Sequence, residues 1–157
     1  MKRASLFAFL ILFSACSEAP LSRKEQTADA VLKQAASALK KERGLIAIGT
    51  GGQMRGPIQM LALSFEYRNP VGVEEGRQLL LSARKELLDQ INADSSIRAF
   101  LGEYPFTEKN VEIRIFVRNP DGSSRPEREI ALLSAIDHRL EYGLRNRGVP
   151  RFEMVSF

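Results

Sequence analysis

Two segments in which apolar side chains alternate with other residues flank one long amphipathic segment, and this arrangement restricts the fold more than any other feature. In residues 111–118 every second side chain is a β-branched apolar one, which is typical of a strand with one buried face. Residues 58–68 alternate in a similar way. Between these segments, residues 73–93 carry apolar side chains at helical spacing, at Leu80, Ala83, Leu87 and Ile91. The sequence therefore predicts a strand, a long helix and a second strand.

The glycine-rich stretch Gly49-Thr50-Gly51-Gly52 follows a short apolar run at 45–48, which we predict to be a strand. A dinucleotide-binding loop has the pattern G-x-G-x-x-G before a helix, whereas here the sixth position is Met54 and a strand pattern follows. The Gly-Lys-Ser/Thr ending of a phosphate-binding loop does not occur in this stretch. We therefore predict that the glycines form a flexible hairpin connection, where positive φ angles are available to them.

Residues 124–145 fit two secondary structures. Apolar residues recur at helical spacing, but alternate residues from Ile130 to Tyr142 also fit one face of a long strand. The alternation continues through charged residues on the other face, and the Asn-Pro-Asp-Gly turn at 119–122 favours a return beside the preceding strand. We predict one long strand here, with a helix as the alternative, and a last strand at 152–157.

The N-terminal segment 24–43 is predicted to be a second helix. Ser22 and Glu25 have the spacing of a capping box, and Gly44 can end the helix in the left-handed conformation. The apolar stripe of this segment is thin and rich in alanine, so the helix either docks on the domain or forms a stalk.

These elements predict an α+β fold. We expect a mostly antiparallel sheet of about five strands, with one long helix packed on a face and an additional N-terminal helix. Because 157 residues have room for one domain of ordinary size, we assign a single domain to residues 44–157.

The first sixteen residues have the pattern of an export signal. Lys2 and Arg3 precede an uncharged, mostly apolar run at 4–15, which is shorter than the roughly 20 residues needed to span a membrane. Cys16, the only cysteine of the chain, follows the small residues Ser14 and Ala15. We predict a signal peptide at 1–15. The alternatives are an ordinary cleaved leader with an incidental cysteine, or an uncleaved N-terminal anchor.

The stretch Leu12-Phe13-Ser14-Ala15-Cys16 resembles the lipobox of bacterial lipoproteins, with Phe13 where that family prefers Leu. The resemblance implies that Cys16 carries a diacylglycerol thioether, that the chain is cut before it, and that the new amino group is acylated. Residues 16–23 would then be the lipidated cysteine and a tether, and two or three acyl chains would hold the protein stably in a lipid bilayer.

The lipobox also implies a location in the cell envelope. Ser17, in the position where an aspartate favours retention in the inner membrane of enterobacteria, favours the outer membrane. The run from Leu63-Ser64-Phe65-Glu66 through Ile91-Asn92 to Tyr104-Pro105-Phe106-Thr107 resembles short envelope proteins of chlamydia-like bacteria. That second resemblance implies no activity.

The residue types needed for catalysis or metal binding are scarce. One cysteine excludes an intramolecular disulfide, and one cysteine with one histidine argues strongly against a zinc or iron–sulfur site. On a strand, His138 and Asp137 would point to opposite faces, and Ser134 would lie about 13 Å from His138. Glu66, Glu103, Glu108 and Asp137 are candidate acids or bases, but no spacing brings two of them together. We therefore predict no catalytic residue, no metal and no cofactor, and the only site residue is Cys16.

The charge argues against nucleic acid as a partner. The full chain has a net charge of +4, and removal of Lys2 and Arg3 with the leader lowers it to +2. A locally basic cluster remains near the C-terminus, at Arg139, Arg145, Arg147 and Arg151. Such a cluster either touches anionic lipid or is a solvated face, and we predict the solvated face.

Three functions remain. The first is a membrane-anchored, non-enzymatic module that binds another envelope protein or assists assembly through a sheet face or edge. The second is a small-ligand or lipid binder with a pocket between the helix 73–93 and the sheet, lined by Leu63, Phe65, Leu80 and Leu87. The third is an envelope hydrolase, which requires converging polar side chains in a cleft. We expect the first.

Overall fold

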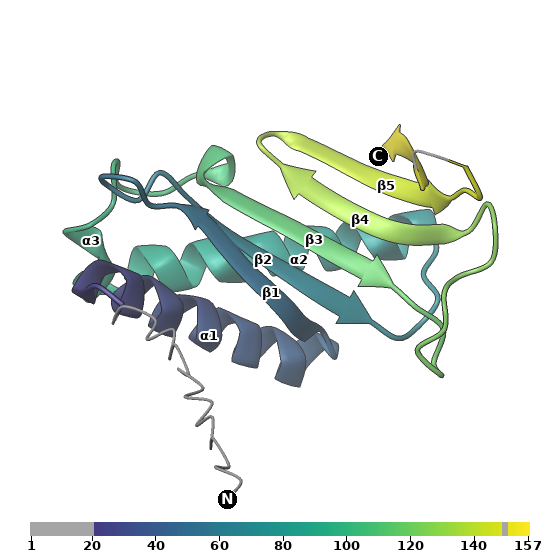
Figure 1. Ribbon diagram of the computed structural model, residues 1–157, viewed down its shortest axis with the longest axis horizontal. Helices are drawn as coiled ribbons and strands as arrows, with labels where there is room; N and C mark the ends of the chain where they lie inside the picture. The colour runs from purple at the N-terminus through teal and green to yellow at the C-terminus, as the bar shows by residue number, and fades with distance from the viewer. Residues whose placement is uncertain (1–20, 149–150) are drawn as a thin grey trace, which may run out of the picture.

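A computed structural model describes residues 21–148 and 151–157, which form one six-stranded sheet with helices packed against it (Figure 1). The α+β class predicted from the sequence is confirmed. In chain order the elements are α1 (Arg23–Arg43), β1 (Ile46–Gln53), β2 (Met60–Tyr67), α2 (Val73–Ala93), α3 (Ser95–Arg98), a 3₁₀ turn η1 (Glu108–Asn110), β3 (Val111–Val117), β4 (Ile130–Ile136), β5 (Arg139–Arg145) and β6 (Phe152–Ser156).

The strands lie in the sheet in the same order as in the chain, from β1 at one edge to β6 at the other. β2 and β3 are parallel, with Leu61 opposite Val111 and Tyr67 opposite Val117, because α2 carries the chain back between them. All other described pairs are antiparallel. The sheet is therefore mixed and mostly antiparallel, with one helical crossover.

The sheet has six strands rather than the predicted five because the segment predicted as one long strand is a hairpin. β4 and β5 pair antiparallel, with Ile136 opposite Arg139, so that Asp137 and His138 form a two-residue turn. Asp137 has a φ of 52°, a left-handed conformation that aspartate tolerates better than most residues. The turn lacks the glycine or asparagine that usually marks such a hairpin, and the alternation of residue types continues across it.

The glycine-rich stretch is also placed differently from the prediction. Gly49, Gly51 and Gly52 lie inside β1 and have ordinary φ angles, so the prediction of a flexible hairpin connection at 49–52 was wrong. A side chain on Gly52 would place its Cβ 2.8 Å from the carbonyl oxygen of Met60, so Gly52 allows the two strands to approach closely. The true connection between β1 and β2 lies at 54–59, with Gly56 at a φ of 82°.

Helix α1 docks on the domain. The predicted capping box is present, since the Glu25 amide donates to Ser22 Oγ and the Ser22 amide donates to the Glu25 carboxylate. Gly44 ends the helix in the left-handed conformation, also as predicted. The apolar stripe of α1 is buried in the central core, which excludes the stalk. Lys24 further joins the first turn to the β1–β2 connection by donating to the carbonyl oxygens of Met54 and Gly56, both at 2.6 Å.

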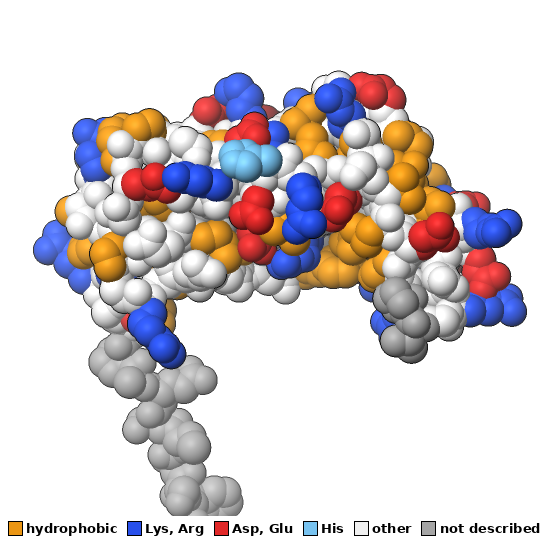
Figure 2. Space-filling model, turned by 90° about the horizontal axis from the view of Figure 1, so that it is seen from above, with side chains coloured by type: hydrophobic (Ala, Val, Ile, Leu, Met, Phe, Trp, Pro, Cys, Tyr) orange, Lys and Arg blue, Asp and Glu red, His pale blue; other side chains and the backbone are white. Residues whose placement is uncertain are grey.

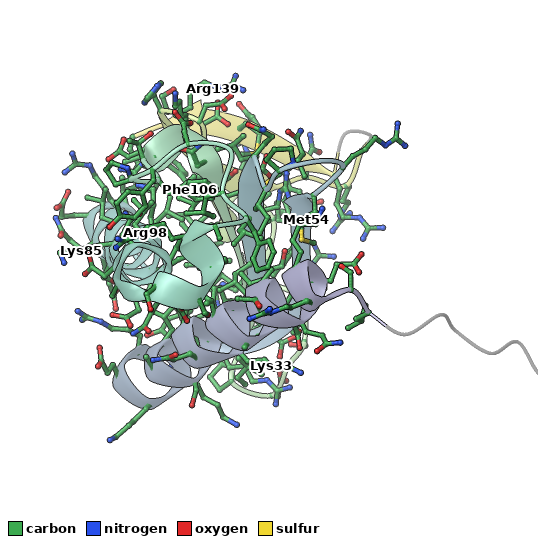
Figure 3. The ribbon with its side chains drawn as sticks, turned by 90° about the vertical axis from the view of Figure 1, so that its left-hand side faces the viewer. Lys33, Met54, Lys85, Arg98, Phe106 and Arg139 are labelled. Carbon is green, nitrogen blue, oxygen red and sulfur yellow. The ribbon has the colours of Figure 1, made fainter. Side chains whose placement is uncertain are left out.

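Both long helices lie on the same face of the sheet. α1 contacts α2, β1 and β2, and α2 contacts β3, β4 and β5. Figure 3 shows the helices on one side of the strands, with Lys33 and Lys85 pointing away from the molecule and Met54 near the start of α1. Along β3 buried and partly exposed residues alternate strictly, so the helix-facing side is buried and the other side is open. The fold thus leaves an open sheet face and two strand edges for contacts with other molecules.

Candidate functional site

The one site residue predicted from the sequence, Cys16, lies outside the described residues. The described chain starts at Leu21, and α1 follows at once. Within residues 21–148 and 151–157, no helix is both long enough and apolar enough to cross a membrane.

His138 lies at the tip of the β4–β5 turn with three quarters of its side chain exposed. Its Nδ1 is 4.0 Å from an Oε atom of Glu108, and the other Oε of Glu108 accepts a hydrogen bond of 2.7 Å from Arg84. Figure 2 shows the histidine beside acidic side chains on the upper face. Sequence reasoning missed this cluster because its members come from α2, η1 and a turn. Because Glu108 is bonded to a buried arginine and His138 is largely solvated, the cluster has the character of a structural ion pair.

The remaining candidate acids and bases do not converge. Glu66 pairs with Arg68 at 2.6 Å. Glu103 accepts a hydrogen bond from the Asn110 amide at 2.6 Å and pairs with Lys109, and these contacts, the Asn110 bond first, lower the pKa of the Glu103 carboxyl. No hydrogen bond joins Ser134 to His138 in the described part of the chain. Nor do any three His, Cys, Asp or Glu side chains of the described residues cluster as metal ligands would.

The side chains proposed to line a small-ligand pocket are part of the packed core. Leu63, Phe65, Leu80 and Leu87 are each at most 1% exposed and belong to one continuous cluster. They line neither the hollow at the β3–β6 end of the sheet nor the shallow depression between α1 and α2. Close packing at this position removes the physical basis for placing a ligand between α2 and the sheet.

The C-terminal arginines divide between two places. Arg145, Arg147 and Arg151 line the hollow at the β3–β6 end of the sheet. Arg139 starts β5 at the opposite end of the same strand, and Figure 3 shows it on the far side of the molecule from α1. Three of the four predicted residues therefore come together, whereas the fourth does not.

The strand β1 is the most exposed regular element of the sheet. Seven of its eight residues are exposed, and the eighth, Gly51, is half-buried. It pairs only with β2 in the described part of the chain, so its outer edge has backbone donors and acceptors without a strand partner. Two large apolar side chains, Ile46 and Ile48, are exposed on it, and Ile48 lies at a bulge between Ala47 and Gly49.

The sequence of β1 lacks most of the features that protect free edges. Its residues, Ile-Ala-Ile-Gly-Thr-Gly-Gly-Gln, include no charged side chain and no proline. Natural proteins usually protect an edge with lysine, proline, short length or a bulge, and of these β1 has only the bulge. An uncharged, exposed edge of eight residues is a template on which an extended segment of another chain can pair.

Comparison of the chain with protein-family models, with curated proteins and with solved structures finds no match.

Proposed function

We propose that this protein is a lipid-anchored, non-enzymatic module of the bacterial cell envelope that binds an extended segment of another envelope protein along β1. The exposed, uncharged edge of β1 is the observation that carries the proposal. Main-chain hydrogen bonds to such an edge supply affinity, and contacts with alternate side chains supply selectivity.

The surroundings of β1 support this role. β1 is fixed on its inner side by pairing with β2, and the start of β2 is in turn packed in the core through Leu61. Lys24 holds the connection that follows β1 against α1. A binding strand held in place in this way loses little conformational entropy when a partner pairs with it.

The anchoring part of the proposal rests on the leader. The single cysteine follows two small residues at the end of an apolar run, and the tether between Cys16 and α1 is only a few residues long. Acylation of Cys16 would hold the domain within about 25 Å of a membrane, because an extended chain spans at most about 3.6 Å per residue.

Photo-crosslinking in intact cells tests the binding strand. A crosslinking amino acid replaces Ile48 on β1 or, as the matched control, Met154 on β6; both native side chains are large, apolar and exposed. We expect one defined adduct with a second envelope protein from position 48 and none from position 154. Ile46→Lys should abolish the adduct, since a charge on an edge strand opposes strand pairing. Equal adducts from both positions, or an adduct of two copies of this chain, would contradict the proposal.

Palmitate labelling with membrane fractionation tests the anchor. The wild-type protein should be labelled and should sediment with membranes, whereas Cys16→Ala should not be labelled. If neither form is labelled and both are soluble outside the cytoplasm, Cys16 is incidental and the anchoring part of the proposal fails, although the crosslinking result still tests β1.

A further inference from the structure

A basic hollow of about 770 Å³ lies at the end of the sheet where β3 and β5 end and β6 begins. This end of the sheet is at the right in Figure 1. Five arginines line the hollow, and none of the described residues that line it is acidic. They come from three parts of the sequence, at Arg118, Arg125, Arg145, Arg147 and Arg151.

Among residues 21–148 and 151–157, two of the five guanidinium groups have a carboxylate partner. Glu129 pairs with Arg125, and Glu127 pairs with Arg147. In the described part of the chain, the other three arginines form no salt bridge. Five positive charges against two negative ones give the hollow a net positive potential, which would attract an anion.

Arg125 is the buried member of the group, with 9% of its surface exposed. Its guanidinium donates to the side chains of Asn119 and Glu129, but its Nε is buried and has no hydrogen-bond partner in the described chain. A buried cation that is only partly compensated is costly in an apolar environment. A negative charge bound in the hollow would reduce that cost.

Two of the arginines are held in place before any ligand arrives. Arg118 donates to Ser124 Oγ at 3.1 Å, and Arg145 donates to the carbonyl oxygen of Arg125. Each bond occupies part of a guanidinium group that has further N–H donors. The planar fork of arginine matches the oxygens of phosphate, and positioning it in advance lowers the entropy lost on binding.

We propose that this hollow is a binding site for a phosphate-bearing ligand. The phosphate would lie among the guanidinium groups, and the aromatic side chains of Phe116 and Phe152, which also line the hollow, would contact the organic part of the ligand. The site is formed by residues of β3 to β6 and the loops beside them and shares no residue with β1, so it goes beyond the proposed binding along β1 and either can fail alone.

The source of the phosphate is either a soluble compound or a lipid headgroup. The hollow lies at the end of the strands opposite the β1–β2 connection, where Lys24 fixes the start of α1 (Figure 1). This step rests on the proposed anchor: a tether from an acylated Cys16 would join the domain at the start of α1, at the end of the strands away from the hollow. This geometry favours a soluble phosphate compound, or a lipid that is not in the anchoring leaflet.

Calorimetric titration of the full-length protein in non-ionic detergent tests the site. Pyrophosphate is the soluble probe, and mixed micelles of the same detergent with and without a lipid monophosphate are the lipid probe, all at matched ionic strength. Arg118→Gln and Arg151→Gln remove lining guanidiniums, whereas Arg139→Gln is the control, because it lies at the other end of β5. Thermal unfolding of each variant shows whether it is folded.

We expect binding of a phosphate probe that weakens about tenfold in each lining variant, the effect of losing one charge-assisted hydrogen bond, and is unchanged in Arg139→Gln. Binding to pyrophosphate indicates a soluble ligand, and binding only to micelles that contain the lipid monophosphate indicates a headgroup; both support the site. The absence of binding to either probe would overturn the proposal. An equal loss in Arg139→Gln would also overturn it, because it would indicate non-specific attraction to positive charge.

Discussion

The two edges of this sheet are built differently. β1 has eight residues, no charge and no proline, and it lies beside α1. β6 has five residues, includes Glu153, and borders the arginine-lined hollow. Short length and charge are the usual protection of a free edge, so β6 is protected where β1 is not. The difference suggests that one edge is suited to pairing with a protein strand and the other to holding an anion.

The supports of the two edges differ as well. β1 is paired with a strand that is part of the hydrophobic core, with Ala47 opposite the fully buried Phe65. The β6 end depends more on ion pairs and on half-buried aromatic contacts such as Tyr142 with Phe157. Variants that remove apolar contacts should therefore weaken the β1 side more, and variants that remove charges should act mainly at the β6 end.

The largest effect is expected from Phe65→Ala. Phe65 is fully buried opposite β1, so its truncation should lower the free energy of unfolding by about 3–5 kcal/mol. Phe157→Ala, at the β6 side, should cost about 1–2 kcal/mol, because Phe157 is half-buried and its ring centroid lies 5.1 Å from that of Tyr142. Urea denaturation in non-ionic detergent measures both, and equal losses would contradict the comparison.

The next effect concerns the close approach of β1 to β2. In Gly52→Ala the new Cβ would lie 2.8 Å from a backbone oxygen, so we expect a loss of about 1–3 kcal/mol in the free energy of unfolding. In Gly51→Ala the nearest atom is the Cβ of Ala62 at 3.6 Å, and stability should change by less than about 0.5 kcal/mol. Thermal unfolding distinguishes them, and a Gly51→Ala variant as unstable as Gly52→Ala would contradict the role given to the close approach of Gly52 to Met60.

A charge variant probes the β6 end. Glu129→Gln removes the carboxylate partner of the buried Arg125, and we expect a loss of about 1–2 kcal/mol in the free energy of unfolding. Glu127→Gln is the matched control, because its partner Arg147 is 86% exposed and a pair of that kind contributes less than about 1 kcal/mol. If both variants were equally stable in urea, burial of Arg125 would have no energetic consequence.

The smallest expected effect concerns a hydrogen bond on the β1 side that depends on the charge of a carboxylate. Asn110 donates to Glu103 and to the carbonyl oxygen of Gln59, just before β2. Because contacts in the folded state lower the pKa of Glu103, its contribution to stability is complete above its ordinary pKa of 4.5 and is lost as the pH falls through the lowered value. The small stability difference between the wild type and Glu103→Gln should therefore disappear in strong acid. A difference in urea midpoint that persists there would contradict this account.

The helices were predictable because their signals are local. The spacing of Leu80, Ala83 and Leu87 and the capping residues of α1 act within a few turns of one helix, and the structure places α2 at 73–93 as predicted. The β4–β5 turn was missed because Asp137 adopts a left-handed conformation without the usual glycine. The extent of β1 was missed because Gly52 is needed for close strand approach, a requirement that depends on Met60 and is invisible before the strands are paired.

The sequence predicted only some of the arginines that line the hollow, because the others reach it through strand pairing. Arg145, Arg147 and Arg151 are neighbours along the chain and were recognised as a basic cluster. Arg118 and Arg125 join them only because β4 pairs with β3 on one side and β5 on the other. Local patterns gave no indication that the buried member of the group would be Arg125.

The single parallel pair of the sheet has a consequence for how the chain reaches its native state. Every other pair joins strands that follow one another directly, so β1–β2 and β4–β5–β6 can form from nearby segments. The pairing of Leu61 with Val111 must close a loop that contains α2 and α3, and such distant contacts form slowly because the entropy of closure is lost before they are made. We expect the docking of α2 across β2 and β3 to be the slow step of folding, the moment at which the two edges become parts of one sheet.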